Sequence, residues 1–338
     1  MKKFLVLGIV LALLLALMGG PVFAAKSTVV HVNPGDSIQA AVDTPGVTKV
    51  IVYAGEYHQS VVINTNDITL IGEGDVILDG DIPADVGTTL GVDGIKLEEG
   101  VSGVTIEGFE IRDYSGTGNG QGNAIQAWNS GTSHITIENN VMHGNSWNAI
   151  LVGNEGEGLH TNWVVRNNDI YDNGAYSLEL TNAQHSEIRG NTVADGYIGI
   201  LVQARNTRPN SGMVTVSNVR VMGNTISGFT YPVYILAQVS EPSDPFGPID
   251  GAQATLEGVM FTGNDVTGGY YGVFAYGYLD GQVNNARIVN NTFSDLSYGV
   301  RIYGNAINNK VVNNTFTNVG TDVIDGGEDT KIPPVGKP

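Results

Sequence analysis

The residue types best suited to chemistry are a glutamate and two arginines in the middle of the chain, Glu179, Arg205 and Arg208. A carboxylate can hold a calcium ion, and a guanidinium can act as a base or neutralise the carboxylate of a substrate. Glu179 could instead pair with Glu155 or Glu157, because a glycosidase needs two carboxylates. We therefore take Glu179, Arg205 and Arg208 as candidate catalytic residues, with Glu179 also the candidate ligand of a calcium cofactor.

A second group of residues is suited to holding a sugar. Aromatic rings stack on the apolar face of a sugar ring, and amide and guanidinium groups can bind its hydroxyl groups. Such residues recur in this chain at positions that period-two alternation turns away from the core. A solvent-facing row of aromatic residues is unusual without a binding partner. The candidate substrate-binding residues are Gln126, Trp128, Gln203, Tyr234, Tyr276, Arg301 and Tyr303.

The repeat that places these residues is clearest in NTFSDLSYGVRIY, which begins at Asn291. An Asn is followed by an apolar residue, a short polar turn, a Tyr-Gly-Val run and further alternating residues. The pattern recurs as NTISGFTYPVYIL from Asn224 and NDVTGGYYGVFAY from Asn264, with spacings of 22 to 40 residues between successive copies along the chain. A short unit with variable insertions is typical of a solenoid, in which each unit buries its apolar face by stacking on its neighbours.

Each unit is predicted to contain three short strands, so stacking forms three parallel sheets around a narrow core. The Asn that opens the repeat tolerates a left-handed backbone and can bond the neighbouring units through its amide. Stacked along the axis, these amides should form a ladder. The predicted ladder consists of Asn140, Asn168, Asn191, Asn224, Asn264, Asn291 and Asn314.

Long insertions are confined to one side of the predicted first sheet. They follow the Tyr-Gly-Val strand at 153–162, 203–218, 238–258 and 276–285, so they should form a wall along one edge of that sheet. Long loops on a rigid scaffold are where binding residues concentrate. The alternative is that these loops fold over the aromatic row and bury it. The candidate catalytic cluster also takes in His160 from the first of the four loops.

The repeat and the opening of the chain resemble the right-handed parallel β-helix proteins of the pectate-lyase-like superfamily, in the branch of NosD-like proteins with β-helix repeats. The opening motif is PGDSIQAAVD, followed by VIVYAGEY, ITLIGEG and VILDG. The resemblance implies an all-β fold, a single-stranded right-handed parallel β-helix of about ten coils. It also implies a substrate on the outer face of the first sheet. The residues themselves predict a short capping helix at 36–43, since Asp36 or Ser37 can cap it and Ile38, Ala41 and Val42 share one face.

Two hypotheses about function follow from the resemblance. In the first, the chain binds an extracellular acidic polysaccharide and cleaves it by β-elimination, a lyase reaction that we favour over hydrolysis. In the second, it is a non-catalytic carbohydrate-binding or surface-interaction protein, or a NosD-like periplasmic accessory protein. The paired aspartates of polygalacturonases and the aspartate-rich calcium site of pectate lyases are missing from the predicted outward rows. The class of reaction therefore stays open at this stage.

Composition and the chain ends bear on location and partners. The 338 residues include 34 acidic and 16 basic side chains and no Cys, with a formal charge of −18. This balance argues against nucleic acid, whose affinity comes largely from Lys and Arg. Residues 1–25 have the basic start and apolar run of a secretory signal peptide, too short for a membrane span. We expect a secreted, periplasmic or cell-surface monomer without a stable membrane anchor, with its β-helix at 26–325 and a tail at 326–338.

Overall fold

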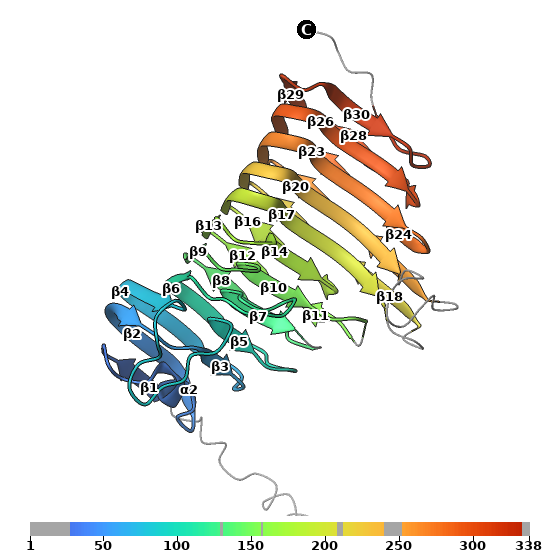
Figure 1. Cartoon of the computed structure of the whole chain (residues 1–338). Helices are drawn as coiled ribbons and strands as arrows, with labels where there is room; N and C mark the ends of the chain where they lie inside the picture. The colour runs from blue at the N-terminus through green and yellow to red at the C-terminus, as the bar shows by residue number, and fades with distance from the viewer. Residues whose placement is uncertain (1–27, 129–130, 157, 208–211, 240–251, 333–338) are drawn as a thin grey trace, which may run out of the picture.

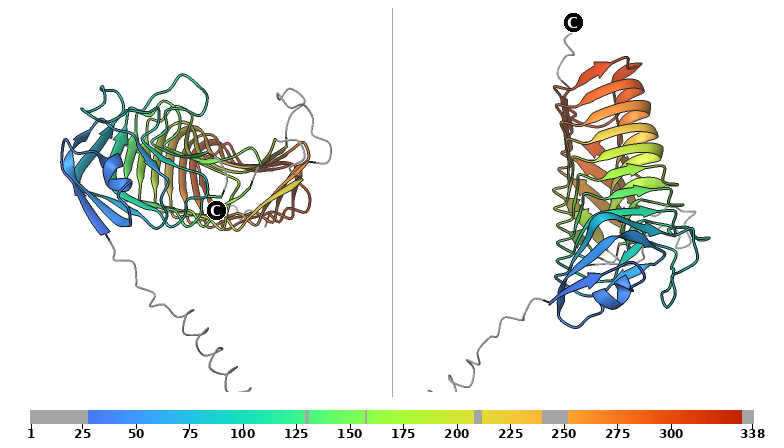
Figure 2. Two further views of the ribbon diagram at one scale, coloured as in Figure 1. Left: turned by 90° about the horizontal axis from the view of Figure 1, so that it is seen from below. Right: turned by 90° about the vertical axis from the view of Figure 1, so that its left-hand side faces the viewer.

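Successive turns of the chain stack on one another with all strands parallel, and the strands form three sheets around one elongated core (Figure 1). The structure is a computed structural model, and it describes residues 28–128, 131–156, 158–207, 212–239 and 252–332. The predicted signal peptide at 1–25 lies outside these residues. The first strand, β1 (Thr28–Val32), and the last, β30 (Thr321–Asp325), lie at opposite ends of the stack (Figure 2).

The first sheet is the one that the Tyr-Gly-Val strands form. In its later coils the strand of the third sheet bends directly into the strand of the first sheet, so that one long strand serves both. The strands of the first sheet are β3 (Val61–Ile63), β5 (Ile95–Leu97), β7 (Ile125–Trp128), β10 (Ile150–Gly153), β14 (Tyr176–Thr181), the second halves of β17 (Thr192–Asn206), β20 (Thr225–Val239), β23 (Asp265–Tyr278) and β26 (Thr292–Gly304), and β30.

The second and third sheets use shorter strands. Three long strands at the N-terminal end, β2 (Val47–Tyr57), β4 (Thr69–Asp79) and β6 (Thr105–Arg112), contribute to both sheets. The second sheet continues with β8 (Thr136–Glu138), β12 (Val164–Arg166), β16 (Glu187–Arg189), β19 (Arg220–Met222), β22 (Met260–Thr262), β25 (Arg287–Val289) and β28 (Lys310–Val312). The third continues with β9 (Val141–His143), β13 (Asp169–Tyr171), the first halves of the long strands from β17 to β26, and β29 (Thr315–Thr317).

Alternation along each strand builds the core. In β8, for example, Ile137 is fully buried while its two neighbours are partly exposed. Val165 lies directly beside it in the next coil, and Ile188 lies beside Val165 in the coil after that. Each coil therefore adds a layer of Val, Ile, Leu or Phe side chains to a continuous interior. Because a shift of one residue would turn every inward side chain outward, this core fixes the register of the sheets.

The asparagine ladder is present. Each amide oxygen accepts two bonds from the Asn of the preceding coil, one from its backbone N–H and one from its side chain. For Asn224 these bonds come from Asn191 at 2.9 Å each, and Asn224 in turn donates to Asn264 at 2.9 Å. The ladder runs from Asn140 to Asn314, as predicted. A second ladder at the next bend, Asn145 to Asn173, was not predicted.

A short helix covers the N-terminal end of the core. It is α2 (Ile38–Val42), where a helix is predicted for 36–43, and its buried residues Ile38, Ala41 and Val42 face the first coil. The Ala40 N–H donates to the Ser37 hydroxyl at 3.1 Å, which caps the helix N-terminus. At the other end, the chain differs from the predicted tail. Residues 326–332 continue the last coil, since Glu328 and Lys331 form bridges with residues of the preceding coil.

The long connections from the first sheet contain strands of their own. Four of these strands form a further parallel sheet, and two more form a pair. The reason is alternation within the insertions themselves, as in MVTVS, whose two valines are buried. The sheet consists of β18 (Met213–Ser217), β21 (Gln253–Glu257), β24 (Gly281–Asn284) and β27 (Ala306–Ile307), and the pair of β11 (His160–Thr161) and β15 (Ala183–Gln184). The described parts of the long connections beside the first sheet therefore include regular β-structure.

Candidate functional site

The outward side chains of the first sheet form two rows, in the register that the repeat predicts. The middle of these rows is covered, since Leu151, Glu179 and Gln203 are only 3 to 4% exposed. The first row passes from Gln126 through Glu179 and Tyr234 to Arg301, each in line with a residue of the neighbouring strand. The second row includes Trp128 at one end and Tyr303 at the other. Every described candidate on this sheet lies in the predicted row or beside it, but the rows divide into two regions of different character.

The first region is an open pocket of about 770 Å³ over the middle coils. Leu151, Trp147 and Tyr176 contribute to its walls, and Gly153 leaves room for the Trp128 ring, since a side chain there would come within 3.0 Å of it. The pocket brings together six of the predicted residues: Gln126, Trp128, Glu179, Gln203, Arg205 and Tyr234.

Glu179 lies at the base of the pocket and is 4% exposed. Its Oε2 accepts a hydrogen bond from Asn148 Nδ2 at 3.0 Å, and its Oε1 lies 2.9 Å from the Thr181 hydroxyl. The same hydroxyl lies 3.0 Å from Gln203 Oε1, so a hydrogen-bonded chain joins the carboxyl to the next coil. Burial raises the pKa of Glu179, although the bonds from Thr181 and Asn148 and the charge of Arg205 act against this rise.

Arg205 supplies the positive charge of the pocket. Its Nη2 lies 3.4 Å from Glu155 Oε2, and the Thr207 hydroxyl donates to the same carboxylate. Glu155 and Arg205 therefore form an ion pair on the rim, with the guanidinium close enough to Glu179 to influence its charge. Two further residues of the predicted cluster, Arg208 and Glu157, lie outside the described residues.

His160 is placed differently from the prediction. It belongs to the predicted cluster by sequence, but its side chain is fully buried behind β10. Its Nδ1 lies 2.5 Å from the Thr132 hydroxyl and its Nε2 3.3 Å from the Gly153 carbonyl, with the Trp163 ring edge-on to the imidazole. His160 belongs to β11, which pairs with β15 of the next coil, so the end of its loop is part of the stack. The histidine therefore packs inside the solenoid and does not line the pocket.

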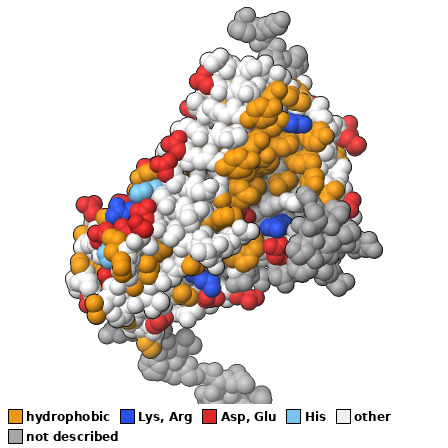
Figure 3. Space-filling view, in the orientation of Figure 1, with side chains coloured by type: hydrophobic (Ala, Val, Ile, Leu, Met, Phe, Trp, Pro, Cys, Tyr) orange, Lys and Arg blue, Asp and Glu red, His pale blue; other side chains and the backbone are white. Residues whose placement is uncertain are grey.

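The second region is an aromatic platform over the later coils. Its rings form one connected network with centroid distances of 4.6 to 6.4 Å. Nine of the 14 tyrosines of the chain belong to it, and Figure 3 shows the resulting hydrophobic patch over β20, β23 and β26. The platform comprises Tyr197, Tyr231, Tyr234, Tyr270, Tyr271, Phe274, Tyr276, Tyr278, Tyr298 and Tyr303.

Only part of the platform was predicted. Tyr234, Tyr276 and Tyr303 follow from the alternation within the first sheet. The tyrosines at the bend into this sheet, such as Tyr271 and Tyr298, belong to the predicted Tyr-Gly-Val run but are not among the predicted substrate-binding residues. The signal that could have found them is a tyrosine that recurs directly before the glycine-like position in three later repeats, at Tyr231, Tyr271 and Tyr298. Tyr234 also lines the pocket, so the two regions are continuous.

The pocket does not fit the predicted calcium ion. Calcium takes six to eight oxygen ligands, several of them from carboxylates. Both oxygens of Glu179 already face protein hydrogen-bond donors, and Glu155 is engaged by Arg205 and Thr207. Among the residues that the structure describes, no group of three or more His, Asp or Glu side chains is placed to hold a metal.

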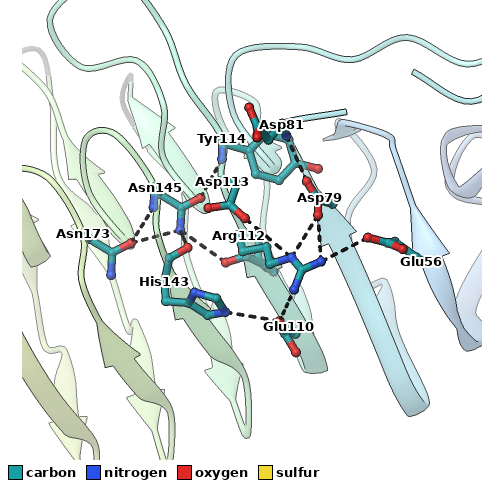
Figure 4. A network of polar contacts seen from close by, with 11 residues as sticks. Glu56, Asp79, Asp81, Glu110, Arg112, Asp113, Tyr114, His143, Asn145 and Asn173 are labelled. Atoms are coloured by element: carbon teal, nitrogen blue, oxygen red, sulfur yellow. Dashed lines mark hydrogen bonds and ion pairs between the residues drawn. The ribbon is translucent and has the colours of Figure 1, made fainter. Parts of the chain in front are cut away.

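A separate cluster of charge on the third sheet was not predicted (Figure 4). Arg112 lies within 2.9 to 3.2 Å of Asp79, Glu56 and Glu110, which come from three successive coils. Burial acts to raise the pKa of Asp79, but hydrogen bonds from the Asp81 backbone and from Arg112 bring it below its ordinary value. Because its donors and acceptors satisfy one another, we interpret this cluster as a structural clamp between the coils.

Comparisons with known proteins agree with this architecture. A family model for a right-handed β-helix region matches residues 89–236, and no curated protein matches the chain. A tailspike protein from Acinetobacter baumannii bacteriophage Fri1, a capsular polysaccharide depolymerase, is 13% identical with a TM-score of 0.53, covering 90% of this chain and 64% of its own. A protein of Geobacillus virus E2 is 13% identical with a TM-score of 0.54 over 90% and 60%.

The catalytic domain of a GH87 α-1,3-glucanase also matches, with 14% identity and a TM-score of 0.47 over 91% of this chain and 70% of that one. The family model and the tailspike structure confirm the predicted fold, a right-handed parallel β-helix. At these identities the likeness concerns the fold. Within the described residues, no helix has the length and apolar character of a membrane span.

Proposed function

We propose that this chain binds an extracellular polysaccharide along the outer face of its first sheet. The observation that carries the proposal is the continuity of the pocket with the aromatic platform through Tyr234. The combined face is long and narrow, with stacking surfaces at one end and polar groups at the other. Such a face suits a chain of sugar units better than a compact ligand, and an apolar patch of this extent is typical of a binding surface.

Binding can be tested by affinity electrophoresis through gels that contain single polysaccharides. The wild-type chain should be retarded by at least one polymer of the panel, and Trp128→Ala should be retarded less, because its ring lines the pocket. A suitable control is Tyr53→Ala, whose ring stacks on His31 in the first coil, remote from the platform. Unretarded migration of the wild type through every gel would refute the proposal.

We further propose that the chain acts outside the cytoplasm as a monomer. The basic and apolar start of the sequence supports export, and the absence of cysteine leaves folding independent of the redox state of the compartment. Cell fractionation, with mass measurement of the mature N-terminus and of the native particle, tests both statements. Retention of residues 1–25 in the mature protein would contradict the proposed export.

A second candidate function is cleavage of the bound polymer by β-elimination. The observation that favours it is a buried carboxyl with a raised pKa, Glu179, close to the guanidinium of Arg205. In this reaction Arg205 would neutralise the carboxylate of a uronate unit, and Glu179 in its ionised form would accept the C5 proton. The electron pair forms the C4–C5 double bond as the C4–O bond breaks. Tyr176, whose pKa burial raises, would protonate the leaving oxygen.

The elimination leaves an unsaturated uronate that absorbs ultraviolet light, which gives a direct assay. Wild-type protein should produce this absorbance from a uronate polysaccharide, and Glu179→Gln should not, because an amide cannot accept the proton. Binding of the polymer without any new absorbance or reducing ends would instead support the non-catalytic hypothesis. Release of reducing ends without absorbance would indicate hydrolysis, with Glu155 as the second carboxylate.

A further inference from the structure

Arg301 stands at the far end of the platform in surroundings unlike those of the other arginines. The centre of its guanidinium lies 5.1 Å from the ring centroids of Tyr271 and Phe274 and 4.7 Å from that of Tyr303. Its Nη1 donates a hydrogen bond to the Tyr271 hydroxyl. The rings hold the guanidinium in one place on the outer face of the first sheet, since stacking favours a fixed orientation of this flat cation.

No carboxylate pairs with Arg301 among the described residues, and its Nε is shielded from solvent without a hydrogen-bond acceptor. Four arginines elsewhere on the solenoid do have carboxylate partners, namely Arg112, Arg166, Arg189 and Arg205. Arg220 and Arg287 have no such partner in the described residues, but their side chains are exposed to water. Within the described residues, Arg301 is therefore a half-buried cation whose charge is met only by aromatic rings and the hydroxyl of Tyr271.

A half-buried charge is unfavourable unless an opposite charge or hydrogen bonds compensate it, and cation–π contacts compensate it only in part. The chain has 34 acidic side chains, yet none of those that the structure describes forms an ion pair with Arg301. We propose that Arg301 binds a carboxylate or sulfate group of the polysaccharide, in a subsite separate from the pocket at Glu179. This inference rests on the proposed function, because it assigns the charge of the polymer that the first sheet binds.

The distance between the two regions adds a requirement on the ligand. Glu179 and Arg301 occupy the same row of the first sheet and are separated by four strand spacings. At about 4.8 Å for each spacing, their backbones are roughly 19 Å apart. A ligand that fills the pocket and reaches Arg301 must therefore be an oligomer, and its anionic group must lie well away from the unit in the pocket.

The test compares acidic polymers with neutral counterparts of the same backbone. Affinity electrophoresis uses polygalacturonate, alginate and hyaluronan, each also in carboxyl-reduced form, together with dextran sulfate and dextran. Wild-type protein should bind an acidic polymer more tightly than its neutral counterpart, with a difference that shrinks as salt is added. Arg301→Gln should lose about tenfold in affinity for the acidic polymer and little for the neutral one, and Arg301→Lys should lose less.

The matched control is Arg189→Gln, which removes an arginine paired with Glu187 on the second sheet and should leave both affinities unchanged. Thermal unfolding of each variant shows whether it is folded. Equal binding of acidic and neutral polymers by the wild type, or equal losses for both in Arg301→Gln, would overturn the anionic subsite while leaving the proposed function intact. A failure of every polymer to bind would overturn the proposed function, and the subsite with it. Preference for dextran sulfate over the uronates would assign sulfate.

Discussion

The substitution Glu179→Gln should change how the stability of the protein depends on pH. Burial raises the pKa of this carboxyl above its ordinary value of 4.5, so the folded state holds the proton more tightly than the unfolded chain. The stability that comes from the protonated carboxyl is fully present below pH 4.5 and is lost as pH rises through the folded pKa. Glutamine does not titrate, so the variant lacks this loss.

The size of the effect follows from one proton and the hydrogen bonds at the site. The free energy of unfolding of the wild type should fall relative to the variant by up to about 1.4 kcal/mol per pH unit above pH 4.5, and then level off above the folded pKa. For a domain of this length that slope corresponds to roughly 2 °C in melting temperature per pH unit. The amide fits the site, since its oxygen can accept from Asn148 and its NH₂ can donate to Thr181.

The assay is denaturant unfolding of both proteins from pH 4 to 8 at constant ionic strength. Glu73→Gln serves as the control, because Glu73 is exposed on β4 and the same substitution there removes a solvated charge. The difference between Glu179→Gln and wild type should grow with pH, and more steeply than the difference between Glu73→Gln and wild type. Parallel curves for Glu179→Gln and wild type, or a wild type that gains stability with pH relative to the variant, would refute the electrostatic account of the pocket.

Three further predictions concern the ladder, the clamp and the platform. Asn224→Ala should lower the free energy of unfolding by about 4 kcal/mol, because two donors of Asn191 lose their acceptor inside the stack. Asn314 lies at the half-exposed end of the ladder, so a loss for Asn224→Ala that is no larger than the loss for Asn314→Ala would contradict this. Asp79→Asn should destabilise the protein by about 2 kcal/mol at pH 7, and the difference in stability from wild type should disappear as pH falls through the lowered pKa of Asp79. A difference in stability that does not depend on pH would argue against the ion pair with Arg112. Tyr276→Ala should weaken polysaccharide binding about tenfold in calorimetric titration, and unchanged affinity would remove this ring from the site.

The rows of the first sheet could be predicted from sequence because the repeat fixes both the register and the facing of each residue. Once the Tyr-Gly-Val strand is aligned, alternation places Glu179 and Arg301 outward in one line, and the structure agrees. The asparagine ladder follows for the same reason, since each Asn opens its repeat. These features depend on short sequence patterns that recur in every coil, so the stacking of the coils repeats the same contact along the axis.

Other features depend on contacts that the repeat does not encode. The β18–β21–β24–β27 sheet forms because insertions of different length happen to align, and His160 is buried because one such insertion joins the stack. The clamp at Arg112 draws on carboxylates from three coils whose spacing in the sequence is irregular. The contacts of Arg301 with Tyr271 and Phe274 depend on how the Tyr271 side chain is directed at the bend between the third and first sheets. Alternation within a strand does not predict that direction.

The central claim is that the outer face of the first sheet binds a polysaccharide, and affinity electrophoresis of one double variant tests it most directly. Trp128→Ala combined with Tyr303→Ala removes a ring from the pocket and a ring from the platform, while Tyr53→Ala removes a ring elsewhere. The account predicts that a polymer which retards the wild type will retard Tyr53→Ala equally and will no longer retard the folded double variant. Equal retardation of all three proteins would contradict it.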